Sequence, residues 1–239
     1  MLKKSIFYLL TFGIVINFLS FPVFAQSSEE KYFTNLREKM VKEQIEARGI
    51  KDKKVLEAMR KVPRHKFVPE KYRHYAYEDR PLPIGLGQTI SQPYIVALMT
   101  ELLELDENDK VLEVGTGSGY QAAVLAEIVE KVYSVEILEK LGKEAKKRLK
   151  NLGYTNVEIK IADGYYGWKE NAPYDAIIVT CAAEHVPPPL IKQLKEGGKM
   201  CIPVGGIFFQ NLMLIEKKEG KVISKNILPV RFVPMLGEH

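Results

Sequence analysis

The fold is decided by the stretch Val111-Leu112-Glu113-Val114-Gly115-Thr116-Gly117-Ser118-Gly119, an apolar strand that runs into a glycine-rich turn. Glycines let the backbone approach a ligand closely, and the helix expected after the turn presents free N–H groups at its N-terminus. The spacing is G-x-G-x-G and differs from the G-x-G-x-x-G of dinucleotide binders, because position 120 is tyrosine. A tight turn without any ligand can use the same glycines, so this motif alone specifies little.

Short apolar strands alternate with helices around and after this turn. Strand patterns cover residues 111–114, 131–135, 157–161, 176–180 and 199–204, and helix patterns cover 120–129, 138–149 and 190–194. The alternation predicts a doubly wound, mostly parallel α/β sheet of Rossmann-like type with helices on both faces. Residues 211–217 and 221–228 leave no room for a crossover helix, so they predict an antiparallel C-terminal hairpin. We therefore expect seven strands.

The part of the chain before residue 109 is expected to be helical, with one irregular stretch. Apolar residues at helical spacing predict a helix over 32–47, and Asp52 is a candidate cap for a second helix that Pro63 stops. Pro93 suits the first turn of a helix that runs to about residue 103. Residues 62–92 between them are proline-rich with little periodicity, which is typical of a segment that covers or forms a site.

Composition limits the class of protein. The chain has 239 residues, 46% of them hydrophobic and 27% charged, with 35 Lys+Arg against 30 Asp+Glu and a formal charge of +5. This predicts one globular domain over 32–239, with helices and a substrate loop in 32–108 and the sheet in 109–239. The evenly mixed charge argues against a nucleic-acid partner. Two cysteines and four scattered histidines predict no metal site. We expect a monomer.

The first 25 residues have the pattern of a targeting segment. Lys3 and Lys4 precede an apolar run, and Val23-Phe24-Ala25 places small residues where a signal peptidase reads. The run is also long enough for an uncleaved membrane anchor. Residues 1–25 are therefore interpreted as a signal peptide or anchor, which would be the chain's sole membrane contact, and 26–31 as a polar linker.

Two acidic positions follow the next strands of the predicted sheet. Glu136 ends one strand, 21 residues after Gly115, where a carboxylate can accept both hydroxyls of a ribose. Asp163-Gly164 ends the following strand, where an adenine edge would lie. Each has a simpler interpretation, a helix-capping acid for Glu136 and an ordinary turn for Asp163-Gly164. Taken together with the glycine turn, the three strand ends predict an adenosine-type ligand at the switch point of the sheet.

Several longer passages resemble one enzyme family. The specific one is Gly85-Leu86-Gly87-Gln88-Thr89-Ile90-Ser91-Gln92-Pro93, preceded by Arg64-His65-Lys66-Phe67-Val68-Pro69. With the glycine turn, residues 173–180, 194–199 and 203–205, and Arg231-Phe232-Val233-Pro234, it is similar to protein-L-isoaspartate O-methyltransferases over about residues 32–235. The resemblance implies the fold of S-adenosylmethionine-dependent methyltransferases, with a C-terminal hairpin and N-terminal helices.

The resemblance also implies an activity and a set of site residues. The expected reaction is methyl esterification of the free carboxylate of L-isoaspartyl or D-aspartyl residues in damaged proteins, with S-adenosyl-L-methionine as donor and no metal. Ser91 would be the catalytic residue that aims the carboxylate, although Ser91 could instead cap the helix that starts at Pro93. The implied cofactor residues are Thr89, Ile90, Ser91, Gly115, Thr116, Gly117, Ser118, Gly119, Glu136, Ile137, Asp163 and Gly164. The implied substrate residues are Ile90, Ser91, Arg231 and Val233.

Alternatives stay open for the substrate and the compartment. A methyltransferase for exocyclic amines would typically carry [Asn/Asp]-Pro-Pro-[Tyr/Phe] after the fourth strand, where this chain has Thr180-Cys181-Ala182-Ala183. A non-catalytic adenosine-binding module is the other alternative. Cofactor supply and the family resemblance predict the cytoplasm, whereas residues 1–25 suggest export or an inner-membrane tether.

Overall fold

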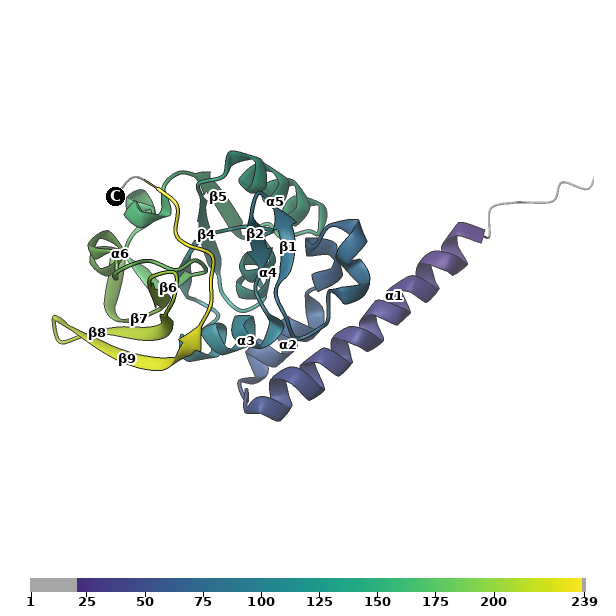
Figure 1. Cartoon of the computed structure of the whole chain (residues 1–239), viewed down its shortest axis with the longest axis horizontal. Helices are drawn as coiled ribbons and strands as arrows, with labels where there is room; N and C mark the ends of the chain where they lie inside the picture. Colours follow the sequence, from purple (N-terminus) through teal and green to yellow (C-terminus); the bar gives the residue numbers. More distant parts are fainter. Residues whose placement is uncertain (1–20, 238–239) are drawn as a thin grey trace, which may run out of the picture.

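The computed structural model describes residues 21–237 of the chain. The signal or anchor segment expected at 1–25 therefore lies for the most part outside the described residues. The polar linker expected at 26–31 is instead part of α1 (Phe21–Met40), whose first half extends away from the rest of the domain in Figure 1. Residues 28–32 are exposed and continue this helix without a break. Among the described residues, no helix is both long and apolar enough to span a bilayer.

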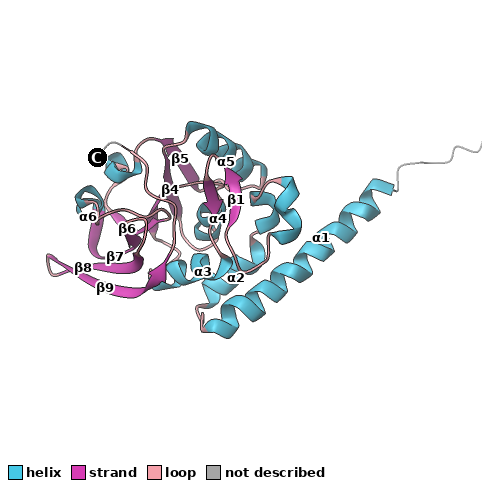
Figure 2. Cartoon of the chain, in the orientation of Figure 1, coloured by secondary structure: helices cyan, strands magenta, loops and turns pink. Residues whose placement is uncertain are grey.

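A seven-stranded sheet forms the centre of the domain, as predicted (Figure 2). Its strands are β3 (Lys110–Val114), β4 (Lys131–Glu136), β5 (Val157–Ile161), β6 (Tyr174–Val179), β7 (Leu194–Gly205), β8 (Gln210–Lys218) and β9 (Lys221–Val230). Their order in space is β5-β4-β3-β6-β7-β8-β9. The pairs from β5 to β7 are parallel, and β8 and β9 add an antiparallel end. The predicted C-terminal hairpin is therefore confirmed.

Helices cover both faces of this sheet. They are α2 (Lys53–Lys61), α3 (Pro93–Leu102), α4 (Tyr120–Ala126), α5 (Glu139–Asn151) and α6 (Pro188–Gln193). Neighbouring residues of β3 face opposite layers, since Val111 packs in the cluster that includes α2, α3 and α4, and Leu112 packs in the cluster that includes α6. Asp52 caps α2 by accepting from the N–H of Lys54 at 2.8 Å, and Pro93 opens α3, both as expected.

Two predicted elements have different bounds in the structure. The helix expected over 32–47 changes at Met40 into a π-helical segment η1 (Val41–Ile45) and a 3-10 segment η2 (Glu46–Arg48). The last strand of the parallel set begins at Leu194 and not at residue 199, because β7 pairs with β6 on both sides of a bulge over 195–198. A bulge interrupts the apolar alternation, so the sequence pattern shows only the second part of this strand.

Residues 62–92 contain more structure than their sequence predicts. Two 3-10 segments, η3 (Arg64–Phe67) and η4 (Glu70–Tyr75), lead into an antiparallel pair, β1 (Leu82–Gly85) and β2 (Gln88–Ile90). Strands of three or four residues are too short to show a period of two, which explains why the pattern missed them. The pair matters for the site because β2 contains Thr89 and Ile90 and is followed directly by Ser91, and these three residues line a cavity together with residues of the sheet.

Candidate functional site

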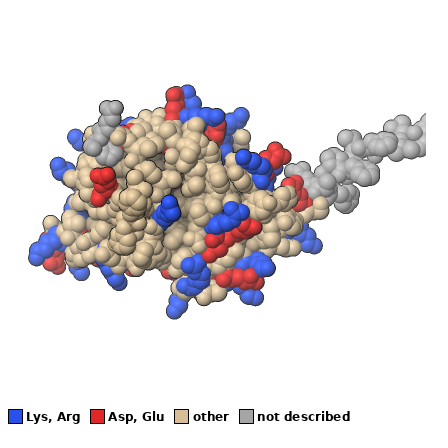
Figure 3. Space-filling model, in the orientation of Figure 1, with Lys and Arg blue, Asp and Glu red and all other residues tan. Residues whose placement is uncertain are grey.

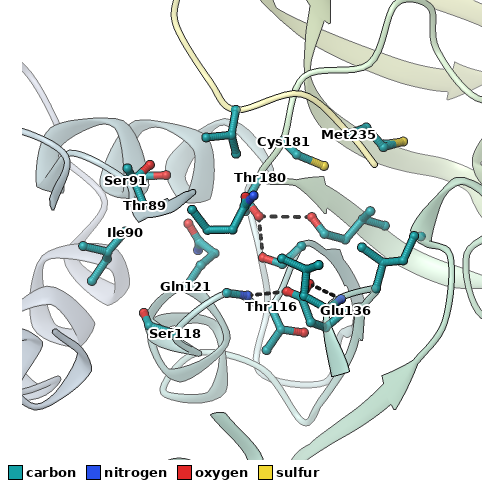
Figure 4. Close-up of a pocket in the computed structure, with 18 of the residues that line it drawn as sticks. Thr89, Ile90, Ser91, Thr116, Ser118, Gln121, Glu136, Thr180, Cys181 and Met235 are labelled. Carbon is teal, nitrogen blue, oxygen red and sulfur yellow. Dashed lines mark hydrogen bonds between the residues drawn. The ribbon is translucent and has the colours of Figure 1, made fainter. Parts of the chain in front are cut away.

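A cavity opens where the order of the parallel strands reverses. The chain passes from β3 to β4 on one side and returns to β6 on the other, so the carboxyl ends of β3 and β6 flank a crevice. Ligands of open α/β sheets bind at such switch points. The cavity is partly open, with about 760 Å³ of empty space that includes solvent at its mouth, and Figure 4 shows ten of its residues by name. Its lining consists of Gln88, Thr89, Ile90, Ser91, Val96, Val114, Gly115, Thr116, Gly117, Ser118, Tyr120, Gln121, Val135, Glu136, Ile137, Leu138, Gly164, Thr180, Cys181, Val233, Pro234, Met235 and Leu236.

The glycine turn between β3 and α4 forms the floor of the cavity. The Gly115 N–H donates to the Val135 carbonyl at 2.9 Å, and the Gly115 carbonyl accepts from Thr180 Oγ1 at 2.6 Å. Thr180 Oγ1 also lies 3.1 Å from the Val114 carbonyl oxygen. Gly115 has a φ of +97°, and a Cβ placed there would lie 2.6 Å from Thr180 Oγ1. Only glycine therefore fits this position without moving the turn or the Thr180 side chain that is bonded to it.

Glu136 lies at the end of β4 with its carboxylate in the wall of the cavity. It is 6% exposed, and its Oε2 accepts from the Gly117 N–H at 2.7 Å. Its Oε1 accepts from the Leu138 N–H at 2.9 Å, at the start of α5. The N-cap of α5 is Leu138, with no side-chain cap, so Glu136 is not the capping residue, although its carboxylate binds the Leu138 N–H just before the helix. The ligand interpretation remains compatible with this geometry. An ionised carboxylate has about four acceptor positions, so two stay available to the hydroxyls of a ribose.

If the cavity binds the adenosine-type ligand that the sequence predicts, Glu136→Gln is expected to weaken the binding of S-adenosyl-L-homocysteine about 10- to 100-fold. The amide keeps the size of the side chain but turns one oxygen into a donor that faces a backbone N–H. A hydrogen bond to a charged group contributes about 1.5–3 kcal/mol, which sets this range. Isothermal titration calorimetry would measure it, with the exposed Glu130→Gln as a control that leaves the affinity unchanged. Unchanged affinity in Glu136→Gln would remove Glu136 from the cofactor site.

A buried carboxyl group below the glycine turn was not identified from the sequence. Glu113 is fully buried in β3, and its Oε2 accepts from Ser134 Oγ at 2.5 Å. Ser134 Oγ also lies 2.5 Å from Thr116 Oγ1, so the three side chains form one hydrogen-bonded row under the cavity. Burial above all, together with the nearby charge of Glu136, raises the pKa of Glu113 to about 8, although the hydrogen bond from Ser134 opposes this shift. Glu113 is therefore mostly protonated at neutral pH and adds little negative charge beside Glu136.

Ser91 lies on the side of the cavity opposite Glu136, together with Thr89 and Ile90 (Figure 4). The residue at the N-cap of α3 is Gln92, with no side-chain cap, so the interpretation of Ser91 as a helix cap is wrong. The Ser91 carbonyl accepts from Nη2 of the fully buried Arg64 at 2.7 Å. Within the described part of the chain, no group hydrogen-bonds to the Ser91 hydroxyl. The backbone of Ser91 is thus fixed while its hydroxyl stays available to a ligand.

The segment 231–236, called here the strap, closes the cavity on a third side. The Gln210 side chain holds it at Phe232, accepting from the N–H at 2.7 Å and donating to the carbonyl at 3.2 Å. Further along, the Val233 carbonyl accepts from the Ala182 N–H at 2.8 Å, and the Met235 N–H donates to the Ala182 carbonyl at 2.7 Å. In Figure 1 the strap is the yellow segment that runs from β9 toward the C-terminus.

A second cavity of about 1100 Å³ adjoins the first. The two share Thr89, Ser91, Thr180 and Val233, so Ser91 lies at their junction. Arg48 and Arg231 line the second cavity, and no acidic residue is among its lining residues. Arg48 forms an ion pair with Asp79 at 2.8 Å, whereas Arg231 has no carboxylate partner among residues 21–237. An anionic group in this cavity would therefore face an unpaired positive charge.

The structure brings most of the predicted site residues together. Gly119 and Asp163 do not line the cavity: Gly119 is the N-cap of α4, and Asp163 accepts from the Tyr165 N–H at 2.9 Å as the turn interpretation required. Gly164 does line it. Thr180 and Cys181 line the cavity but were not predicted as site residues. They directly follow the carboxyl end of β6, and this position is the signal that could have identified them. In the part of the chain that the structure describes, no cluster of His, Cys, Asp or Glu could hold a metal ion.

The fold and this crevice define a class of protein. A seven-stranded sheet with an antiparallel end and a glycine turn at its switch point is the architecture of Rossmann-like methyltransferases that use S-adenosylmethionine. The model of the protein-L-isoaspartate(D-aspartate) O-methyltransferase family matches residues 35–239. The chain belongs to this family.

Individual relatives agree with this assignment. A protein-L-isoaspartate O-methyltransferase 2 of Syntrophobacter fumaroxidans is 63% identical over 190 residues, which cover 79% of this chain and 77% of the relative. Another from Shewanella sediminis is 52% identical over 235 residues, covering 98% and 96% of the two chains.

Solved structures agree as well. A protein-L-isoaspartate O-methyltransferase structure matches with a TM-score of 0.78 and 35% identity. The match covers 84% of this chain and 66% of that protein's chain, slightly less than two thirds. A structure from Plasmodium falciparum that holds S-adenosyl-L-homocysteine has a TM-score of 0.74 and 29% identity, covering 84% of this chain and 98% of that one.

Proposed function

We propose that the chain transfers a methyl group from S-adenosyl-L-methionine to the free carboxylate of an L-isoaspartyl or D-aspartyl residue in a damaged protein, and so starts its repair. The observation that carries this proposal is the Ser91 hydroxyl. It lies without a partner among the described residues, at the junction of the cavity at the switch point and a second cavity with an unpaired arginine. Family membership supports the same substrate.

The first cavity fits the cofactor. Gly115 leaves the backbone open to close approach, Glu136 keeps free acceptor positions for ribose hydroxyls, and Ile137 and Leu138 offer apolar surface beside it. When bound, S-adenosyl-L-methionine supplies a methyl group on a positively charged sulfur. Thr89, Ile90 and Ser91 close the cavity on the side opposite Glu136, and Thr89 and Ser91 also line the second cavity, so they would hold the part of the cofactor that carries the methyl group.

The chain needs no general base for this reaction. A carboxylic acid with a pKa near ~4 is already ionised at neutral pH and is itself the nucleophile. Ser91 donates a hydrogen bond to one carboxylate oxygen and leaves the other free for an in-line attack on the methyl carbon. Arg231 and Val233 position the substrate backbone from the strap. Catalysis then rests on orientation and the exclusion of water.

The product explains the link to repair. The carbonyl carbon of a methyl ester is more electrophilic than that of a carboxylate, and methoxide leaves it more readily than oxide or hydroxide. The adjacent backbone nitrogen therefore attacks this carbon, its proton leaves with the methoxide as methanol, and a succinimide forms without the enzyme. Water opens this ring at either carbonyl, which returns part of the residue to normal aspartate. The proposed substrate is thus a damaged protein or peptide, and the proposed reaction uses neither a nucleic acid nor a metal ion.

The direct test uses the full chain, labelled S-adenosyl-L-methionine and two peptides that differ only in carrying aspartate or isoaspartate. Base-labile label is expected only in the isoaspartyl peptide. Equal labelling of both peptides would contradict the substrate assignment. Cofactor binding without labelling of either would favour a non-catalytic adenosine-binding module.

Ser91→Ala is expected to lower kcat/KM for the isoaspartyl peptide about 10- to 100-fold, because the carboxylate loses the hydrogen bond that orients it. The affinity for S-adenosyl-L-homocysteine should change less than about threefold. Ser224→Ala, an exposed serine of β9, is the matched control and should change neither value. A parallel loss of cofactor affinity and turnover in Ser91→Ala would assign Ser91 to the cofactor alone.

We also propose that the enzyme acts in the cytoplasm, where its cofactor is made, and as a monomer. The pattern in residues 1–25 predicts export or a membrane tether instead. Cell fractionation with an antibody against the chain separates these possibilities. Recovery from the membrane or an exported fraction would contradict the cytoplasmic proposal.

A further inference from the structure

Three consecutive apolar side chains are exposed in the turn between β7 and β8. Ile207 is 82% exposed, Phe208 is fully exposed at 102%, and Phe209 is 64% exposed. We call residues 207–209 the apolar turn. Single exposed apolar residues are common, but two adjacent phenylalanines beside an isoleucine leave a contiguous apolar surface in water, which indicates an interaction site.

The apolar turn is built on a fixed base. Gly205 and Gln210 pair at the start of the β7–β8 hairpin, and the Gly205 N–H donates to the Ala183 carbonyl at 2.9 Å. Gln210 is buried and also holds the strap at Phe232. Because its base is anchored, the turn loses less conformational entropy when a partner covers it.

The apolar turn is continuous with the candidate substrate site. A third cavity of about 1180 Å³ is lined by Ile207 together with Arg231 and Phe232 of the strap. The same two strap residues line the second cavity, which contains Ser91. The turn also follows the carboxyl end of β7, at the sheet edge where the cofactor cavity opens. In Figure 3 uncharged side chains dominate the centre of the face around a hollow, and most charges lie toward its rim.

We propose that the apolar turn binds apolar side chains that flank the damaged residue in an unfolded segment of the substrate protein. This inference rests on the proposed function. Ser91 is half-buried at the junction of two cavities, so a segment that has left the fold of the substrate protein reaches it most easily. Such a segment exposes apolar side chains that were buried, and their contact with Ile207 and Phe208 removes both surfaces from water. The enzyme thereby favours unfolded apolar segments over polar surface loops.

Two other occupants fit the surface less well. A second copy of the chain would bury about 150–250 Å² for each aromatic side chain, which for three apolar residues stays below the ~800 Å² per partner of a stable interface. A membrane-binding loop normally combines apolar with basic residues. The residues from Gly205 to Gln210 include neither Lys nor Arg, and Glu184 is the neighbouring charge in the third cavity together with Arg231.

The test compares two fluorescent isoaspartyl peptides of equal length and charge, one with Leu and Phe beside the isoaspartate and one with Ser and Gly. Anisotropy with S-adenosyl-L-homocysteine gives Kd, and methyl transfer gives KM and kcat. Phe208→Ser is expected to raise Kd and KM for the apolar peptide about tenfold, with kcat unchanged. Kd and KM for the polar peptide should be the same in Phe208→Ser as in the unchanged chain.

Ile223→Ser is the matched control, since Ile223 is 51% exposed near the other end of the β8–β9 hairpin. Ile223→Ser should leave Kd and KM unchanged for both peptides. Equal Kd of Phe208→Ser and the unchanged chain for the apolar peptide would overturn the docking surface. Loss of self-association in sedimentation, or loss of binding to anionic lipid vesicles, with peptide Kd unchanged would instead assign the turn to a second copy or to a membrane. If neither peptide is methylated, the proposed function is contradicted. The Kd of the apolar peptide for Phe208→Ser and for the unchanged chain would still show whether the apolar turn binds it.

Discussion

Gly115→Ala is expected to weaken the binding of S-adenosyl-L-homocysteine more than about 100-fold and to lower the Tm. The backbone at Gly115 has a φ of +97°, which costs an alanine about 1–3 kcal/mol. The new Cβ would also lie 2.6 Å from Thr180 Oγ1, an atom fixed by its hydrogen bond to the Gly115 carbonyl. Relief requires either that Thr180 gives up its hydrogen bonds to the turn or that the turn shifts, and both changes distort the floor of the cavity. Calorimetric titration measures the affinity, and thermal unfolding measures the Tm.

Gly49→Ala separates the two causes. Gly49 has nearly the same φ, +99°, but no atom lies within 4 Å of the added Cβ, and Gly49 is not part of the cavity. Its substitution should lower the Tm through backbone strain and leave cofactor affinity unchanged. If Gly115→Ala binds as tightly as Gly49→Ala, the glycine turn does not form the cofactor floor.

The sequence predicted those parts of the site that belong to regular elements. Glu136, Gly164 and the glycine turn could be placed because each follows an apolar strand, and the carboxyl ends of parallel strands meet at one edge. The strands themselves were found because buried parallel strands form short, nearly continuous apolar runs. Ser91 was found through a family resemblance, and the residues alone favoured a helix cap that the structure does not contain.

The rest of the site depends on contacts that leave no local pattern. Phe232 lies next to Gln210 only because the β8–β9 hairpin brings the two residues together. The sequence around either residue therefore does not predict the hydrogen bonds between them. Glu113 looked like one polar residue within an apolar strand, and only its complete burial in the fold explains why its pKa is raised to about 8. The apolar turn interrupts no predicted strand, so only its exposure in the fold sets it apart.

Glu113→Gln is expected to change the pH dependence of stability by about 4 kcal/mol between pH 5 and pH 9. The ordinary pKa of a glutamate in the unfolded chain is 4.5, and burial raises the pKa of Glu113 to about 8 in the folded chain. Between these values the folded state holds a proton that the unfolded state has lost, so the free energy of unfolding falls as the pH rises. About three pH units at ~1.36 kcal/mol each give the expected size. Glutamine stays neutral and removes this dependence.

The measurement is urea unfolding of both chains at pH 5, 7 and 9. Because every other titrating group is common to the two chains, the difference between their unfolding free energies isolates Glu113. This difference should shift in favour of Glu113→Gln as the pH rises and level off above the folded-state pKa. Glu130→Gln removes an exposed carboxyl group of the same chemistry and should give a difference that stays nearly constant with pH. A constant difference for Glu113→Gln as well would mean that Glu113 is ionised in the folded chain, with two carboxylate charges flanking the glycine turn.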